Sequence, residues 1–272
     1  MKENQKYIKL PIFLKPNFKT ELVRIGDNND GGYCISKSAL KETTMLYSFG
    51  LNDDWSFERE FRKKSGAKVI CFDHSVTLVF WVKRLIKDIL QFILLKKPNL
   101  RTIKRFFTFF HYKLFFNNSE KIHEKKFFGS NEQFKLDSRD EKIIDMKEIL
   151  RRWPSDKIFM KIDIEGSEYR ILEDIIENQS RITGLAIEFH DCDLMIEKIK
   201  LFIERFNLDL VHIHVNNYGL IKKNGFPTVI ELTFSHKKYN LRRDSSENNF
   251  PIKNLDQPNN KNRTDDQIFF YK

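Results

Sequence analysis

Short apolar runs alternate with amphipathic stretches through most of this chain. The runs have the length and composition of β-strands and occur at Met45–Phe49, Lys68–Asp73, Lys157–Asp163, Gly184–His190, Leu208–Val215 and Thr228–Phe234. Most of the segments between them place apolar residues at helical spacing. Alternation of this kind predicts an α/β fold with a mainly parallel sheet and helices on both of its faces.

The last two predicted strands are joined differently from the others. The segment between them contains Asn216, Asn217, Gly219, Gly225 and Pro227 and no helical pattern. We therefore expect an antiparallel hairpin at the carboxyl-terminal end of the sheet. Beyond it the chain becomes polar, which predicts an irregular tail over 236–266, followed by a short QIFFY segment that could dock as a small strand.

The length and cysteine content of the chain limit its domain organisation and the compartment in which we expect it. A chain of 272 residues suits one domain, 1–272, with room for an insertion. Its three cysteines, Cys34, Cys71 and Cys192, are scattered and odd in number, which argues against a disulfide framework and favours a reducing compartment. The first twenty residues are charged and lack a continuous apolar stretch, so we expect neither a secretory signal nor an anchor there and a cytoplasmic protein.

The net charge of +10 is concentrated in one segment. Between Trp81 and Lys126 there are 12 Lys or Arg residues against 3 Asp or Glu residues. We predict a basic, aromatic helical insertion at 76–120, and its charges preclude a membrane span. Two interpretations stay open: a helical pair packed on its own sheet, or peripheral contact of 78–116 with the inner face of the membrane. Nucleic acid is not an expected partner.

Two carboxylates follow one predicted strand directly. Asp163 and Glu165 lie in the segment KIDIEGSEY, where the apolar run stops and Gly166 turns the chain into a helical pattern. In an open α/β sheet, the carboxyl ends of the strands border the ligand crevice. The alternative is structural: Glu165 would stabilise a helix N-terminus and Asp163 would form a surface ion pair.

The first predicted strand and its turn have features of a nucleoside site. Gly50 follows the strand, where the backbone can approach a ligand, and Asn52 comes next before a helix capped by Asp53 or Asp54. About twenty residues later Asp73 ends the second strand, a position at which an acidic side chain commonly binds ribose hydroxyls. Alternatively, Asp73 caps a helix that begins near Val76.

Several separate blocks together resemble the FkbM-type S-adenosylmethionine-dependent methyltransferases. These blocks are RIGDNNDGGYCI, LYSFGLNDDWSFE, VICFDHS, KIDIEGSEYRIL, LAIEFH, HIHVNN with GFPTVIELTF, and LDQPN. The resemblance implies a Rossmann-like class I methyltransferase fold, S-adenosyl-L-methionine as cofactor, and methylation of a hydroxyl on a sugar, glycan precursor or related small metabolite. Segment 76–120 falls outside these blocks, so the resemblance implies no role for it.

The resemblance also assigns roles to individual positions. The cofactor-binding residues would be Gly50, Asn52, Asp73 and Asp163, with Asp163 and Glu165 on the acceptor side of the crevice. The segment from Asp30 to Tyr33 would close the pocket.

A base must take the hydroxyl proton, and histidine is the side chain best tuned for this near neutral pH. Our first candidate is His190, with Glu165, His212 and His214 as alternatives. We therefore take His190, Asp163 and Glu165 as the catalytic residues. Alternation along HIHV places His212 and His214 on one sheet face, where a core role is the commoner outcome.

Other roles for these polar residues remain possible from the sequence. Asp163, Glu165, His190 and Asp191 could together ligate a divalent metal, but nothing in their spacing requires it and we assign none. Asn216 and Asn217 either donate to acceptor hydroxyls or form an ordinary turn. Two other functions stay open for the whole chain: a noncatalytic membrane-peripheral protein that keeps the fold, and an RNA methyltransferase.

Overall fold

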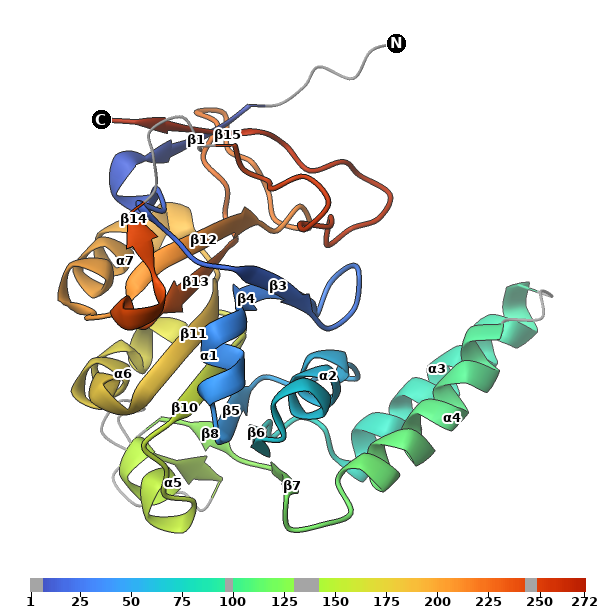
Figure 1. The fold of residues 1–272 in the computed structure, drawn as a ribbon. Coiled ribbons are helices and arrows are strands. Elements are labelled where there is room, and N and C mark those ends of the chain that lie inside the picture. Colours follow the sequence, from blue (N-terminus) through green and yellow to red (C-terminus); the bar gives the residue numbers. More distant parts are fainter. Residues whose placement is uncertain (1–6, 96–99, 130–141, 243–248) are drawn as a thin grey trace, which may run out of the picture.

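The computed structural model describes residues 7–95, 100–129, 142–242 and 249–272. Its centre is a seven-stranded sheet with the strand order β12-β13-β11-β10-β5-β6-β7 (Figure 1). The strands are β5 (Met45–Phe49), β6 (Lys68–Phe72), β7 (Lys121–Glu124), β10 (Ile158–Ile162), β11 (Ile182–Phe189), β12 (Asp209–Val215) and β13 (Ile230–Ser235).

Strand direction in this sheet is mainly parallel. Strands β7, β6, β5, β10 and β11 pair in parallel, whereas β13 pairs antiparallel with both β11 and β12. Strand order reverses between β5 and β10, because the chain adds β6 and β7 on one side of β5 and then crosses to β10 on the other. A crevice is expected outside the carboxyl ends of the strands at such a reversal.

Helices cover the two faces of the sheet, and each face has its own apolar core. Along β5, Tyr47 and Phe49 enter one buried cluster while Leu46 enters the other, as the two-residue period of a strand requires. The first cluster packs under α5 (Met146–Arg152), α6 (Leu172–Glu177) and α7 (Cys192–Arg205), and the second under α1 (Lys37–Glu42) and α2 (Ser56–Ser65) (Figure 1).

Smaller elements border this core. Four two-stranded pairs are formed by β1 (Ile8–Pro11) with β15 (Ile268–Tyr271), β2 (Phe18–Lys19) with β14 (Leu241–Arg242), β3 (Leu22–Ile25) with β4 (Tyr33–Ser36), and β8 (Phe127–Phe128) with β9 (Ile143–Ile144). Short 3₁₀ turns occur at η1 (Ile12–Leu14), η2 (Glu168–Arg170), η3 (Gln179–Arg181) and η4 (Lys237–Tyr239). The terminal β15 is the small strand suggested by QIFFY.

Helices α3 (Leu78–Leu95) and α4 (Leu100–Phe115) form an antiparallel pair that extends away from the rest of the molecule (Figure 1). We call this pair the hairpin. Its base is packed on the core through Trp81 and Tyr112, whose rings lie 5.5 Å apart. None of the helices in the described part of the chain combines the length and the apolar character that a membrane crossing needs.

All six predicted strands are confirmed, but the predicted N-cap of α2 is wrong and one strand of the sheet was not predicted. Helix α2 is capped by neither Asp53 nor Asp54: Trp55 occupies the N-cap, and Asp54 instead accepts a hydrogen bond from the Ser56 amide at 2.8 Å. The sheet also has a strand, β7, that the sequence did not suggest, because KIHE is short, half polar and only partly buried at the sheet edge.

Candidate functional site

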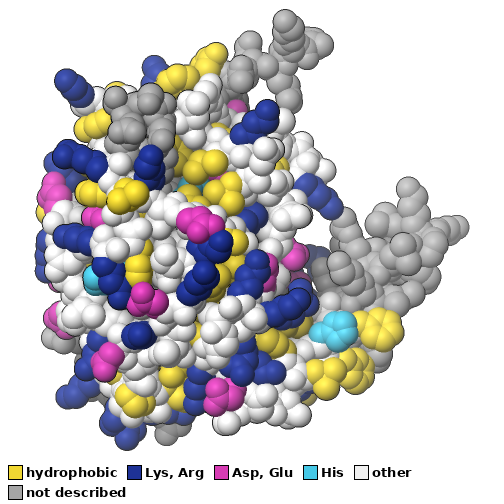
Figure 2. Space-filling model, in the orientation of Figure 1, with side chains coloured by type: hydrophobic (Ala, Val, Ile, Leu, Met, Phe, Trp, Pro, Cys, Tyr) yellow, Lys and Arg dark blue, Asp and Glu magenta, His cyan; other side chains and the backbone are white. Residues whose placement is uncertain are grey.

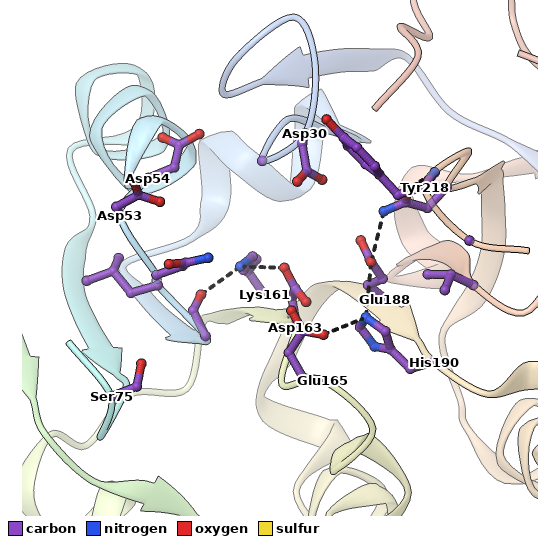
Figure 3. Close-up of a pocket in the computed structure, with 17 residues that line it drawn as sticks. Asp30, Asp53, Asp54, Ser75, Lys161, Asp163, Glu165, Glu188, His190 and Tyr218 are labelled. Atoms are coloured by element: carbon purple, nitrogen blue, oxygen red, sulfur yellow. Dashed lines mark hydrogen bonds and ion pairs between the residues drawn. The ribbon is translucent and has the colours of Figure 1, made fainter. Parts of the chain in front are cut away.

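A cavity of about 760 Å³ opens at the carboxyl ends of β5, β10 and β11, beside the point where the strand order reverses (Figure 3). Loops from β3–β4, β5–α2 and β12–β13 complete its wall. The residues that line it are mostly polar and acidic, and include Asp30, Gly50, Asn52, Asp53, Asp54, Ser75, Lys161, Asp163, Glu165, Glu188, His190, Asn216 and Tyr218.

Gly50 brings two backbone segments together at the floor of the cavity. Its φ angle is +85°, and a Cβ at this position would lie 1.6 Å from the carbonyl oxygen of Asp163. No side chain fits there, so only glycine allows β5 to turn this close to the end of β10. Asn52 follows with a φ of +50° and accepts a hydrogen bond from Arg84 at 3.0 Å.

Lys161 is a buried cation in the cavity wall. Its Nζ donates to the carbonyl of Gly50 at 2.7 Å and lies 3.5 Å from an Asp163 carboxylate oxygen (Figure 3). Burial acts to lower the pKa of Lys161, but the carboxylates of Asp163, Glu58 and Glu188 outweigh it and raise the pKa. The ammonium therefore stays charged and balances part of the surrounding acidic charge.

His190 follows β11 directly and lies among three glutamates. Its Nδ1 is 3.0 Å from Glu168 Oε1, and its Nε2 is 3.4 Å from Glu188 Oε1 and 3.5 Å from Glu165 Oε2. Burial acts to lower the pKa of His190, but the hydrogen bond and charge of Glu168, with the other carboxylates, raise it. Glu168 occupies Nδ1, so Nε2 is the ring nitrogen left for a group in the cavity.

Glu168 itself is fixed by the turn after β10. The Oε1 atom of this fully buried residue also accepts from the backbone amides of Ile164 and Gly166, at 3.1 and 3.2 Å. Glu165 and Gly166 both have positive φ angles, which fold the turn around this carboxylate. Glu168, the first residue of η2, thus holds the turn that precedes it, and no side chain caps η2 or α6. Glu165 extends outward with its side chain 83% exposed.

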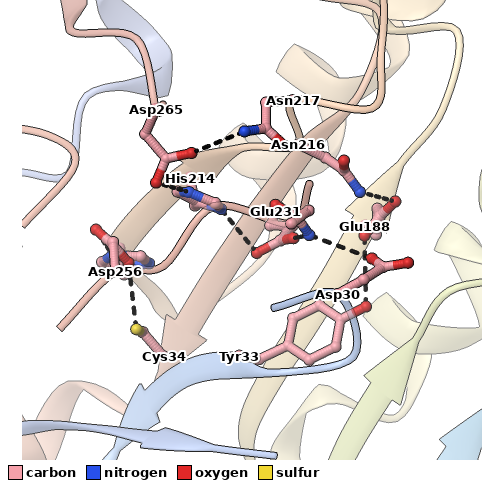
Figure 4. A network of polar contacts seen from close by, with 12 residues as sticks. Asp30, Tyr33, Cys34, Glu188, His214, Asn216, Asn217, Glu231, Asp256 and Asp265 are labelled. Atoms are coloured by element: carbon pink, nitrogen blue, oxygen red, sulfur yellow. Dashed lines mark hydrogen bonds and ion pairs between the residues drawn. The ribbon is translucent and has the colours of Figure 1, made fainter. Parts of the chain in front are cut away.

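A second buried carboxylate, Glu188, joins the cavity to the loops above it. It accepts hydrogen bonds from Asn216 Nδ2 at 3.0 Å and from the Tyr33 hydroxyl at 3.4 Å (Figure 4). Burial and the neighbouring carboxylates raise the pKa of Glu188 well above its usual range, and burial also raises the pKa values of Asp30 and Asp54. These shifts follow from a cavity whose acidic charge exceeds its cationic charge.

Asp73 lies at the edge of the cavity but does not line it. Its carboxylate accepts from the backbone amides of Leu51 and Asn52 at 2.9 and 3.0 Å, and from the amide and hydroxyl of Ser75 at 2.7 and 2.6 Å. Burial would raise its pKa, but these hydrogen bonds prevail and lower it. Asp73 therefore stabilises the turn at Gly50, and Ser75 stands between it and the cavity.

The structure brings together most of the residues that the sequence singled out. Gly50, Asn52, Asp163, Glu165 and His190 all line the cavity, as do Asp30 and Gly31 of the DGGY segment. Sequence reasoning missed three residues, namely Lys161, Glu168 and Glu188. The sequence did contain a signal for Lys161 and Glu188. Each is a charged residue inside an otherwise apolar strand, IFMKI or LAIEF, and a buried charge is rarely found without a partner.

His212 and His214 are both buried and do not line the cavity. Figure 4 shows the polar network around His214. His212 pairs with Asp256 at 3.0 Å, and His214 lies 3.3 Å from Glu231 and 3.1 Å from Asp265. Burial acts to lower the pKa of His214, but Glu231 and Asp265 raise it to about 10. Both histidines thus bind acidic residues of the polar tail and hold it against β12. They are buried structural residues, as the alternation along HIHV favoured.

Two groups of side chains in the described part of the chain have the spacing of metal ligands. Asp163, Glu165 and His190 offer atoms that all lie within 4.8 Å of one another, whereas Asp191 is not part of this group. Cys34, His212 and Asp256 form the other group, deep in the network. Each is also explained by its hydrogen bonds and ion pairs, so neither geometry by itself implies a bound ion.

Comparisons with known proteins give no family assignment. No family model matches the chain, and no curated protein does. One similar solved structure is from Galdieria sulphuraria and was assigned as a sarcosine dimethylglycine methyltransferase. Its sequence is 10% identical, the match covers 73% of this chain and 80% of the other, and the TM-score is 0.36. Another is M. jannaschii TYW2 in complex with AdoMet, with 13% identity, 74% of each chain covered and a TM-score of 0.31.

A third is a Streptococcus thermophilus protein assigned as a hemolysin, with 9% identity, 75% of this chain and 67% of the other covered, and a TM-score of 0.29. Similarity this low supports no conclusion about activity. The strand order and the residues of the cavity are therefore the features that bear on function.

Proposed function

We propose that this protein is an S-adenosylmethionine-dependent O-methyltransferase that methylates a hydroxyl of a sugar, glycan precursor or related small metabolite. One observation carries the proposal: Gly50 and Asp73 end neighbouring strands at the reversal of strand order, beside a cavity large enough for a nucleoside. The order β7-β6-β5-β10-β11 is the 3-2-1-4-5 order of nucleotide-binding α/β sheets. The antiparallel β13 beside it supports the methyltransferase variant of that sheet.

The cavity residues fit the proposed cofactor. A volume of about 760 Å³ lies within the usual range for small-molecule sites. The absence of a side chain at Gly50 leaves backbone accessible, and a ribose hydroxyl would displace the Ser75 hydroxyl from Asp73. The acidic wall, which includes Asp54, suits the ammonium charge of S-adenosylmethionine, and Lys161 could face its carboxylate.

In the proposed reaction, S-adenosylmethionine supplies an electrophilic methyl group. The protein's main contribution is alignment of the acceptor hydroxyl, for which Asp163 and Asn216 are the positioning groups. Nε2 of His190 takes the hydroxyl proton, while Glu168 holds Nδ1 and stabilises the imidazolium that results. Because the pKa of His190 is raised, the free base predominates only above the usual histidine range.

The charge of the cavity also limits the acceptor. The Asp163 carboxylate faces the region beside His190, so a phosphate placed there would be repelled. Tyr218, with 58% of its side chain exposed, stands over the same region and offers an aromatic surface to a sugar ring (Figure 3). An uncharged polyol therefore suits the cavity better than an RNA acceptor.

The proposal is tested by transfer of a labelled methyl group. The full chain is incubated with S-adenosyl-[methyl-³H]methionine and a panel of free sugars, glycan precursors and RNA, and the labelled product is identified by mass spectrometry. We expect a gain of one methyl group on a sugar hydroxyl, with His190→Gln slower and Asn178→Gln, on the distant end of α6, unchanged. Bound cofactor without transfer to any acceptor would instead favour a noncatalytic protein that keeps the fold.

A further inference from the structure

The hairpin carries a continuous apolar face that the protein does not cover. On α3, large aliphatic residues recur every three or four positions and are between 42% and 77% exposed: Leu78, Val82, Ile86, Ile89, Leu90, Ile93 and Leu94. Leu114 of α4 is 69% exposed. Figure 2 shows apolar side chains at the surface of the described part of the hairpin. A water-soluble surface rarely gathers this many aliphatic residues on one helix face without a binding role.

The opposite side of α3 packs on the core of the protein, and this packing fixes the direction in which the exposed face points. Trp81 is buried against Tyr112, and Phe80 packs edge-on against Trp81 at 5.3 Å. Arg84 reaches the loop after β5, where it pairs with Asp53 at 2.7 Å and with Asn52 at 3.0 Å. The hairpin base is thus fixed to the core and to the mouth of the cavity, and the apolar face points away from both.

Charge distinguishes between the possible occupants of this face. Lys83 and Lys87 are exposed beside the aliphatic residues, and the segment Trp81–Lys126 has an excess of 9 positive charges. A second copy of the chain would bring two such basic segments together and be repelled. An aliphatic face edged by basic residues is the pattern of a helix that lies in the interface of an anionic membrane.

We propose that the hairpin docks this protein on an anionic lipid bilayer, with the aliphatic face of α3 in the interface and the neighbouring lysines on the lipid headgroups. Because Arg84 bonds to Asn52 and Asp53 at the cavity mouth, docking through the opposite side of α3 fixes the orientation of the mouth relative to the bilayer. This inference does not depend on the proposed methyl transfer, since it rests only on the hairpin.

The test is co-sedimentation of the full chain with vesicles of phosphatidylcholine alone or mixed with phosphatidylglycerol. We expect binding to the mixed vesicles to be at least about tenfold tighter than to the neutral ones, and to weaken with added salt. The triple variant Val82→Ser, Ile86→Ser and Ile93→Ser should lose about tenfold or more in affinity. All three side chains are about half exposed or more, so folding should be preserved, as circular dichroism would verify.

A control variant removes at least as much exposed aliphatic surface elsewhere. Leu194, Leu201 and Leu220 are 76%, 56% and 69% exposed on α7 and the β12–β13 loop, and changing all three to Ser should leave vesicle binding unchanged. Equal losses in the two triple variants, or no binding to anionic vesicles, would overturn the proposal. So would sedimentation velocity that shows a dimer abolished only by the hairpin variant.

Discussion

The substitution Gly50→Ala tests the close approach on which the cavity depends. Gly50 has a φ of +85°, and the added methyl group would lie 1.6 Å from the Asp163 carbonyl oxygen, where an ordinary contact begins at 3.4 Å. The end of β5 and the end of β10 must therefore separate by about 2 Å. Such a movement displaces Asp163 and breaks the hydrogen bond from Lys161 to the Gly50 carbonyl.

The size of the effect can be estimated with a second glycine as reference. A left-handed conformation costs an alanine about 1–2 kcal/mol. Gly66, which ends α2 with a φ of +74°, has nothing within 4 Å of an added Cβ, so Gly66→Ala should cost only that amount. At Gly50 the steric displacement adds to it, and we expect a total loss of about 3–4 kcal/mol in the free energy of unfolding.

Urea unfolding followed by tryptophan fluorescence measures both variants, and equilibrium dialysis with labelled S-adenosylmethionine measures their binding below the transition. Gly66→Ala should bind as the unchanged protein does, whereas Gly50→Ala should bind weakly or not at all. Equal unfolding free energies for the two variants, together with equal binding, would refute the assignment of Gly50 to the cofactor side of the cavity.

Three further predictions concern buried charges. Glu168→Gln should lower the raised pKa of His190, so the acidic limb of the pH profile of kcat/KM should move to lower pH. An acidic limb that stays in place would contradict the assignment of His190 as the base. Lys161→Met leaves the neighbouring carboxylates without their buried cation and should lower the free energy of unfolding by about 3 kcal/mol, as measured by urea denaturation. A loss under about 1 kcal/mol would contradict this role of Lys161. His214 has a folded pKa raised from 6.5 to about 10, so its contribution to stability is complete below pH 6.5 and lost as pH rises toward 10. Asp265→Asn should move that loss to lower pH in unfolding measured across this window, and an identical pH profile would contradict the pairing.

The strands were predictable because their residues are buried on both faces. Runs such as MLYSF and IFMKI are apolar at four of their five positions, and each forms a central strand with its predicted bounds to within a residue. Strand β7 was not predictable, since an edge strand needs no continuous apolar run. For segment 76–120 the sequence left two interpretations open. The extension of the hairpin into solvent differs from one of them, a helical pair packed on its own sheet, because only the Trp81 side of α3 packs on the core.

The location of the site was predictable, but the partners of its residues were not. Asp163 and His190 follow predicted strands, and strand ends converge at one edge of the sheet. The pairing of His190 with Glu168 depends on a tight turn at Glu165 and Gly166 with positive φ angles, which strand and helix periodicity do not encode. Asp73 was singled out by its spacing from Gly50, yet only the structure shows that it anchors the turn there and does not itself line the cavity.

The central claim is that the cavity beside Gly50 and His190 receives S-adenosylmethionine. Isothermal titration calorimetry of the purified full chain with this compound alone tests it without knowledge of the acceptor. The account predicts saturable heat with one molecule bound per chain, abolished by Gly50→Ala and retained by Gly66→Ala. A flat titration of folded protein at millimolar ligand would contradict it.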